Sequence, residues 1–251
     1  MTRLALISDI HGNGVALEAV LSELACRDVE QIVCLGDIAA GGPQPRQVIE
    51  RLRDLGCPAL RGNADRWPLE GLPPGRSAGT ARLAEVVDWA RSQLSADDLD
   101  YLAALPPTLS IALGRRILFC FHGSPRAEAE ALLVTTPEAQ LDERLAAAPE
   151  ALVFAGGHTH LQLLRPHRNG LLVNPGSVGL PLGAAASAAQ PLPSWAEYAL
   201  IAVDESELEI AFRRVPIDLA ALATATAAMP HSCWAADLTR RIRRSNARAA
   251  A

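Results

Sequence analysis

The stretch LALISDIHGN, residues 4–13, joins a short apolar run to a polar cluster. Leu4–Ser8 has the length and aliphatic composition of a buried strand. Asp9 and His11 follow it directly, and Asn13 suits the N-cap position of the helix that comes next. Because α/β proteins place their sites at the carboxyl ends of parallel strands, this stretch predicts an α/β fold with chemistry-bearing residues after its first strand.

Strand and helix patterns alternate through the first third of the chain. The expected strands are Leu4–Ser8, Gln31–Leu35 and Pro58–Arg61, and the expected helices are about Gly14–Cys26 and Val48–Leu55. This order predicts parallel strands joined by crossover helices.

The rest of the chain contains both kinds of element. Residues 71–105 are expected to be helical, with Ser95 at a helix N-terminus. Leu109–Leu113 and Ile117–Phe121 are expected to form a hairpin around Gly114. The remaining expected elements are a helix near Pro137–Ala147, strands at Leu152–Ala155, Leu161–Leu164, Leu171–Val173, Tyr198–Val203 and Leu208–Val215, and a helical Ala-rich end.

The composition excludes several classes of protein. Hydrophobic residues make up 49% and charged residues 20% of the 251 residues, which predicts a packed core. All 23 basic residues are Arg, so the chain has no Lys for a P-loop or for Schiff-base chemistry. The formal charge of −5 argues against general nucleic-acid binding, although it leaves room for a locally basic site.

The cysteines and the apolar runs predict a cellular location. The five cysteines are scattered without a CxxC pair, as is typical of a reducing compartment. The chain begins with a strand, without a charged and apolar leader, and no apolar run has membrane-spanning length. We therefore expect a cytoplasmic location and no membrane partner.

Polar residues also follow the later predicted strands. They are Asp37, Asn63, His122, His158 and His160, and together with His11 they place four of the six histidines at strand ends. Carboxylate, amide and imidazole groups without thiolate suit Mn, Fe, Co, Ni or a hydrolytic Zn. Two such ions about 3.5–4 Å apart lower the pKa of a shared water and hold phosphoryl oxygens.

Taken singly, these motifs are weak. Asp-x-His arises by chance, Gly-Asp and Gly-Asn-x-Asp are common turn sequences, and a lone His122 at a strand end is more often structural than a ligand. Gly157–His160 is stronger, because two imidazoles one residue apart have few structural uses. The order of all five clusters and their shared placement after strands favour a two-metal site.

In this order the motifs resemble the signature of the calcineurin-like metallophosphoesterases, in the compact bacterial and archaeal phosphodiesterase branch that also includes a metal-poor retromer subunit. They are DIHGN (9–13), GDIAAGGP (36–43), RGNAD (61–65), FHGSP (121–125), GHTH (157–160) and NPGSVG (174–179). The resemblance implies an α/β fold, a four-layer α-β-β-α sandwich of two mixed sheets flanked by helices. We expect this metallophosphoesterase domain to span residues 1–218, with an Ala-rich helical extension, residues 219–251, packed on it.

The resemblance also implies the ligands of two divalent ions, with Mn²⁺ the preferred ion and Fe²⁺, Co²⁺, Ni²⁺ or Zn²⁺ the alternatives. One ion would be held by Asp9, His11, Asp37 and His160, and the other by Asp37, Asn63, His122 and His158. Asp37, Asn63 and His158 are also expected to take part in catalysis, in which a hydroxide bridging the ions attacks phosphorus. NPGSVG is expected to support the loop of His158 and His160.

Two departures from the family pattern bear on catalysis. Many members carry His where this chain has Ala64, and loss of a general acid lowers rates by about 10²–10⁴-fold. Diesters and good leaving groups are therefore expected over difficult monoesters. Asp65 could contact substrate or cap a turn or helix. A phosphate-binding Arg is missing after NPGSVG; Arg66 or Arg126 could replace it or lie on the solvated surface.

The sequence therefore predicts a binuclear phosphoesterase acting on a small phosphorylated substrate, for which a nucleotide is one candidate. A catalytically weak metal-binding scaffold of the same fold is the alternative, motivated by Ala64. A DNA nuclease is a third hypothesis, which the acidic charge disfavours. Arg66–Gly79 and Leu180–Ser194 are the expected walls of the pocket, and an oligomer is left open.

Overall fold

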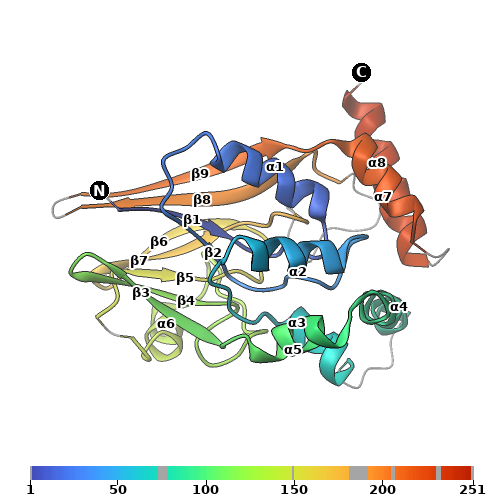
Figure 1. The fold of residues 1–251 in the computed structure, drawn as a ribbon. Coiled ribbons are helices and arrows are strands. Elements are labelled where there is room, and N and C mark those ends of the chain that lie inside the picture. Colours follow the sequence, from blue (N-terminus) through green and yellow to red (C-terminus); the bar gives the residue numbers. More distant parts are fainter. Residues whose placement is uncertain are drawn as a thin grey trace.

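The computed structural model describes residues 2–72, 78–148, 150–180, 192–204, 207–229 and 233–249. Two mixed β-sheets lie face to face, with helices on their outer sides (Figure 1). The first sheet has the strand order β2-β1-β8-β9 and the second has the order β3-β4-β5-β7-β6. The expected sandwich of two mixed sheets is confirmed.

The first sheet grows from the opening stretch of the sequence. β1 (Thr2–Ile7) pairs in parallel with β2 (Gln31–Cys34), and α1 (Gly14–Leu24) crosses over between them. β8 (Trp195–Val203) joins the other side of β1 in antiparallel orientation, and β9 (Leu208–Pro216) pairs with β8. The chain thus returns from its far end to complete the sheet that its first residues begin.

The second sheet contains the middle of the chain. Its hairpin is β3 (Thr108–Leu113) and β4 (Arg116–Phe121), and β4 continues in parallel to β5 (Val153–Ala155) and then to β7 (Gly170–Pro175). β6 (Gln162–His167) forms the edge, antiparallel to β7.

Alternation along the strands explains the four layers. In β1, Leu4 and Leu6 face the second sheet, whereas Ala5 and Ile7 face the helices of the first. A strand that is apolar on both faces must be covered on both, because successive side chains point to opposite sides of a sheet. The core between the sheets includes Leu4, Leu6, Val33, Leu118, Cys120, Val153, Val173, Ala199 and Ile201.

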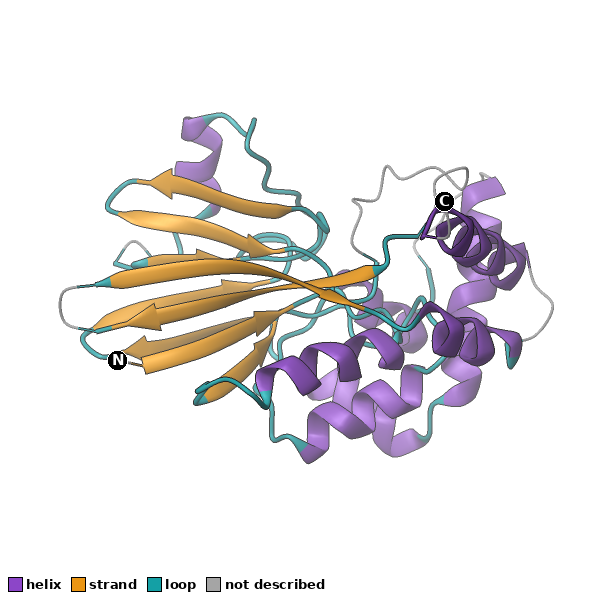
Figure 2. Cartoon of the chain, turned by 90° about the horizontal axis from the view of Figure 1, so that it is seen from above, coloured by secondary structure: helices purple, strands orange, loops and turns teal. Residues whose placement is uncertain are grey.

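Helices cover the outer faces and gather beside one end of the strands (Figure 2). α1 and α2 (Pro45–Asp54) pack on the first sheet, and α6 (Glu138–Arg144) packs on the second through Leu141. The other helices are α3 (Asn63–Glu70), α4 (Ala78–Gln93), α5 (Ala96–Ala104), α7 (Leu219–Ala227) and α8 (Cys233–Ala249). Asn13 caps α1 and Ser95 caps α5 through their side chains, as the sequence predicted.

The C-terminal helices belong to the same hydrophobic core as α1. Leu222 of α7 and Ile242 of α8 are buried in the cluster that contains Leu17 and Val20. The residues expected to form an extension therefore pack on the first sheet's helical layer.

One expected strand is wrong. Pro58–Arg61 forms only an isolated parallel bridge, between Ala59 and Cys34, and the chain then turns into α3. The sequence pattern did not predict α3, because Gly-Asn-x-Asp is a common turn sequence and Pro68 lies within the helix. Over the ranges described here, no helix combines the length and hydrophobicity needed to cross a membrane.

We expect the core between the sheets to dominate stability. Leu6 is fully buried there, so Leu6→Ala should lower the free energy of unfolding by about 2–5 kcal/mol in chemical denaturation. Leu164→Ala is the matched control, because Leu164 is 46% exposed and should change stability by about 0.5 kcal/mol or less. Equal losses in the two variants would contradict this account of the core.

Candidate metal centre and adjoining cavity

The polar residues predicted from strand ends meet at one point, where the two sheets face each other. Asp9 and His11 follow β1, and Asp37 follows β2, so the first sheet supplies three of them. The second sheet supplies His122 at the end of β4 and the pair His158 and His160 after β5, while Asn63 begins α3. The site therefore exists only when both sheets are assembled.

One group of ligand atoms surrounds a single point. The Nε2 atom of His160 lies 3.2 Å from Asp9 Oδ1 and 3.1 Å from His11 Nε2. His11 Nε2 lies 3.5 Å from Asp37 Oδ2, and one ligand atom from each of these four residues lies within 4.8 Å of the others. In an octahedral site with bonds of about 2.1 Å, neighbouring ligand atoms lie about 3 Å apart, so the group has the dimensions of a cation site.

A second group lies on the other side of Asp37. His122 Nε2 is 3.3 Å from Asp37 Oδ2, the oxygen that also faces His11. The ring of His158 lies 5.4 Å from that of His122, centroid to centroid. The other oxygen of Asp37 accepts a hydrogen bond of 2.7 Å from the backbone N–H of Ala64, next to Asn63. Asp37 thus stands between the two groups, in the place of a bridging carboxylate.

Backbone carbonyls fix the orientation of three imidazoles. The Nδ1 atoms of His11, His122 and His160 lie 2.7 Å, 2.7 Å and 2.8 Å from the carbonyl oxygens of Ala40, Leu35 and Leu180. A carbonyl can only accept, so each Nδ1 carries the hydrogen and each Nε2 turns a lone pair toward the centre. In metalloproteins, a hydrogen bond from the other ring nitrogen to a carbonyl or carboxylate orients each histidine that binds the metal.

The buried carboxylates and imidazoles at the centre shift one another's pKa values. Burial by itself raises the pKa of Asp9 and Asp37, but the facing imidazoles outweigh it and hold both pKa values below the ordinary range. Burial by itself lowers the pKa of His122, but Asp37 and Asp9 reverse this and raise it to about 10. The pKa of His160 is raised against burial by Asp9 in the same way.

The other two histidines favour the neutral form. Burial is the leading cause that lowers the pKa of His11, and the same is true of His158.

The lone pairs of His11 and His160 repel each other at 3.1 Å unless a cation lies between them. A proton or a metal ion meets that need, and two buried carboxylates favour the ion of higher charge.

Three buried polar atoms at the centre have no hydrogen-bond partner among the described residues. They are Asp9 Oδ1, Asn63 Oδ1 and His122 Nε2. A buried polar atom without a partner costs about 1–3 kcal/mol, so its presence needs an explanation. Carboxylate oxygen, amide oxygen and imidazole nitrogen are donor types that a divalent cation binds.

The backbone at the centre is strained. Five of the six non-glycine residues with positive φ in the described part of the chain are Asp9, His11, Asp37, His158 and His160, with φ between 51° and 68°. Left-handed backbone costs a non-glycine residue of order 1–3 kcal/mol. Such strain persists where surrounding structure dictates it and is concentrated at functional sites.

Hydrogen bonds between the loops hold these strained residues in place. The backbone N–H of His11 donates to the carbonyl of Asp37, and that of His158 donates to Asp9 Oδ2. The Asn174 side chain donates to the carbonyl of Gly157, and the Ser177 hydroxyl donates to the carbonyl of Asp9. The expectation that NPGSVG supports the loop of the two histidines is confirmed.

Of the two roles expected for Asp65, the structure shows the cap at the start of α3 and corrects the expected substrate contact. Its carboxylate is fully buried and accepts hydrogen bonds from the backbone N–H groups of Asp37, Ile38 and Gly62, at 2.9, 2.7 and 2.9 Å. It therefore faces the loop of Asp37 and not a substrate. Burial and then the charge of Asp37 raise the pKa of Asp65 to about 7, while the N–H groups oppose this rise.

Gly62 shows how closely α3 approaches the Asp37 loop. A Cβ atom at Gly62 would lie 2.1 Å from Asp37 Oδ1 and 2.4 Å from its backbone nitrogen, so only glycine fits. Ala64, at the position where the family often has His, is fully buried in a small apolar cluster with Ala40 and Ala90. The position is part of the packing that holds α3.

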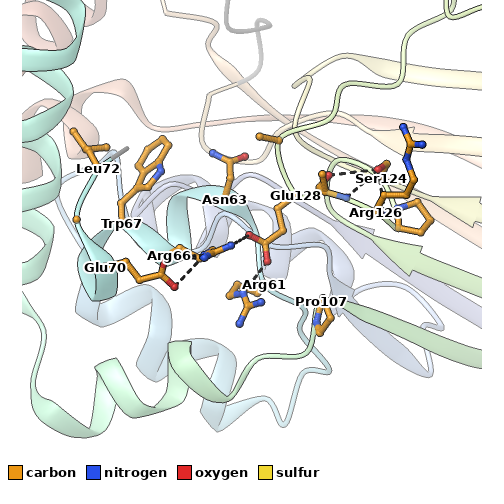
Figure 3. A pocket seen from close by; sticks show the side chains of 14 residues that line it. Arg61, Asn63, Arg66, Trp67, Glu70, Leu72, Pro107, Ser124, Arg126 and Glu128 are labelled. Atoms are coloured by element: carbon orange, nitrogen blue, oxygen red, sulfur yellow. Dashed lines mark hydrogen bonds and ion pairs between the residues drawn. The ribbon is translucent and has the colours of Figure 1, made fainter. Parts of the chain in front are cut away.

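A cavity of about 790 Å³ opens beside Asn63 (Figure 3). α3 forms one wall and the segment after β4 forms the opposite wall. Both proposed substrate-binding arginines line it: Arg66 pairs with Glu70 and with Glu128, and Arg126 pairs with Glu130. The expected wall Arg66–Gly79 is described up to residue 72, and most of Leu180–Ser194 lies outside the described residues.

Sequence reasoning missed Arg61 and Glu128 of this cavity, whereas Trp67 and Glu70 fall within the expected wall Arg66–Gly79, which gave them no individual role. Asn63, Arg66, Trp67 and Glu70 lie at helical spacing, i, i+3, i+4 and i+7, which is a signal of one shared face. The signal was hidden because residues 63–70 were not expected to be a helix. Glu128 has no local signal, since its place depends on the fold.

Comparisons with known proteins agree on a single group. A family model described as the calcineurin-like phosphoesterase superfamily domain matches residues 2–192. An uncharacterized protein of Methanocaldococcus jannaschii is 31% identical over 196 residues, which are 71% of this chain and 76% of that protein.

Solved structures share the fold over nearly the whole chain. A metallophosphoesterase from Sphaerobacter thermophilus is 28% identical with a TM-score of 0.70, covering 96% of this chain and 99% of that one. A hypothetical protein from Pyrococcus horikoshii OT3 is 23% identical with a TM-score of 0.76, covering 96% and 98%.

We expect Asp65→Asn to weaken metal binding without contacting the metal. An amide provides one acceptor oxygen in place of two, so at least one backbone N–H of the Asp37 loop loses its partner. Loss of such outer support lowers metal affinity by about 10–100-fold, which Mn²⁺ titration at pH 8 would measure.

Asp98→Asn is the matched control for this variant. Asp98 is also buried and caps a helix start, accepting from Ser95 at the beginning of α5, and it does not contact the Asp37 loop through any hydrogen bond of the described residues. Both variants should lose stability, but only Asp65→Asn should lose metal affinity. If the two changed Mn²⁺ binding alike, the positioning role of Asp65 would be wrong.

Proposed function

Since the chain belongs to the calcineurin-like phosphoesterase superfamily, we propose that it is a binuclear metal-dependent hydrolase of phosphate esters. The observation that carries the proposal is the convergence of one ligand atom each from Asp9, His11, Asp37 and His160, next to buried polar atoms of Asn63 and His122 that have no hydrogen-bond partner among the described residues. A protein that only needed to fold would not retain strained backbone and unpaired buried atoms at the same point.

Two divalent ions fit the donor set, with Mn²⁺ the preferred choice for oxygen and imidazole ligands. Asp9, His11, Asp37 and His160 would hold one of them, and Asp37, Asn63, His122 and His158 would hold the other. When bound, such a pair supplies a nucleophile at neutral pH and neutralises charge on phosphoryl oxygens.

The chain's own residues hold the proposed metal ligands in position. The carbonyl partners of His11, His122 and His160 keep their Nε2 atoms aimed at the centre, and Asp65 fixes the loop of Asp37. These contacts are in place before any substrate arrives, so little reorganisation is needed during the reaction.

The substrate should be a phosphodiester or an activated phosphomonoester. No imidazole is available at position 64 to protonate a leaving group, because that residue is a buried alanine. A leaving group that departs without a proton does not need a general acid. Hydrolysis of a simple alkyl monoester does need one, and without it should be slower by about 10²–10⁴-fold.

We predict Mn²⁺-dependent hydrolysis of bis(p-nitrophenyl) phosphate. Asp37→Asn should lower kcat/KM by more than about 100-fold, because the metal centre contributes several kcal/mol of transition-state stabilisation. Asp97→Asn, the same change at an exposed position of α5, should leave the rate unchanged. Full activity of Asp37→Asn would refute the proposed site.

A metal-binding scaffold of the same fold is the second candidate, and Ala64 is the observation that favours it. Both candidates predict metal binding, so that removal of metal by a chelator should lower the thermal midpoint and Mn²⁺ should restore it. Binding to the native state alone contributes about 2.7 kcal/mol at a metal concentration 100 times Kd. Restored stability without turnover of any ester would select the scaffold, and no thermal shift would contradict both.

A further inference from the structure

One face of α3 connects the metal centre to the cavity beside it. Asn63, Arg66, Trp67 and Glu70 all line the cavity, and Asn63 is also the ligand that begins the helix. Residues four apart on a helix have Cβ atoms about 5–6 Å apart. The indole of Trp67 therefore lies one helical turn from the metal centre, within reach of a group attached to a phosphate bound there.

Trp67 is held in place from behind. It packs against the buried cluster of Ala40, Ala64 and Ala90, and it also lines the cavity (Figure 3). An indole that is immobilised by packing and still borders a cavity provides a flat apolar surface at small entropic cost. Ala64 is one of the three alanines that give the indole this support.

The arginines Arg61 and Arg66 that line the cavity are already paired with carboxylates. Arg61 Nε lies 2.8 Å from Glu128 Oε1, and Arg66 lies 2.7 Å from Glu70 and 3.6 Å from Glu128. A second phosphate group would have to displace these carboxylates or lie beside them. A neutral ring with donors and acceptors on its edge meets no such opposition, and it finds both hydrogen-bond donors and acceptors in these pairs.

The size of the cavity suits a nucleoside. Its volume of about 790 Å³ lies within the range of about 300–1,000 Å³ found for small-molecule sites. Pro107 and Leu72 add apolar surface near the indole and the ion pairs. The lining thus combines an aromatic surface with a polar floor, which is how proteins bind bases that they do not read by sequence.

We propose that this cavity binds the nucleoside part of a nucleotide substrate, with the base stacked on Trp67 and the phosphate at the metal centre. The inference rests on the proposed function, because that function places the phosphate. The inference adds a substrate class, nucleotides, and a residue that selects for it, Trp67, which is not among the proposed metal ligands.

Binding of two phosphonates to the Mn²⁺-loaded protein tests the inference without turnover. One is the phosphonate analogue of AMP and the other is that of ribose 5-phosphate, in which carbon replaces the ester oxygen so that neither is hydrolysed. By calorimetry, the base should tighten binding by about 5- to 100-fold. In Trp67→Ala this preference should fall to about one, because the stacking surface is gone.

Two further variants separate stacking from folding. Trp67→Phe keeps an aromatic ring and should keep most of the preference. Trp195→Ala removes an indole from β8, outside the cavity, where it packs on Arg214, and should leave the preference unchanged.

Equal binding of the two phosphonates by the native protein would overturn the inference, and so would a preference that Trp67→Ala does not reduce. Tighter binding of the base-free phosphonate would also overturn it and would indicate a sugar phosphate. If esters are hydrolysed in these cases, the proposed function stands while the nucleoside assignment falls. If neither phosphonate binds, the phosphate site itself is wrong and both proposals fail.

Discussion

Two carboxylates, Asp9 and Asp37, are buried at the meeting point of the two sheets, and four imidazoles surround them. Such a concentration of charge is unstable in a protein interior unless cations compensate it. His122 and His160 compensate in part, because the facing carboxylates raise their pKa values, that of His122 to about 10, and so favour their protonated forms despite burial. A divalent cation compensates more completely, since it satisfies carboxylate and imidazole lone pairs together.

Much of the surrounding structure follows from this arrangement. The loops after β1 and β2 adopt left-handed backbone so that their side chains turn toward the centre, and they hydrogen-bond to each other along the way. Asp65, from α3, supports the loop after β2, and Asn174, from the end of β7, supports the loop of His158 and His160 after β5. The strain is maintained because each loop is fixed by another element of the sandwich.

α3 shows how one short helix takes several roles. Its first residue, Asn63, has a buried oxygen without a hydrogen-bond partner among the described residues, and Asp65, in the first turn, joins the helix to the Asp37 loop. Its exposed face carries Trp67 into the cavity, while its buried face rests on alanines. Ala64, which stands in place of a histidine, thus belongs to the alanine cluster on which the indole of Trp67 packs, and Trp67 in turn lines the cavity.

The sequence by itself determined most of the strands and helices, the caps at Asn13 and Ser95, and the set of polar residues at strand ends, because these depend on local periodicity and on residue chemistry. Its resemblance to a known family added the two-sheet sandwich. Only the tertiary structure decided that Asp65 faces a loop and that Trp67 and Glu128 share a cavity. Those facts depend on contacts between segments far apart in the chain, and no periodic pattern encodes such contacts.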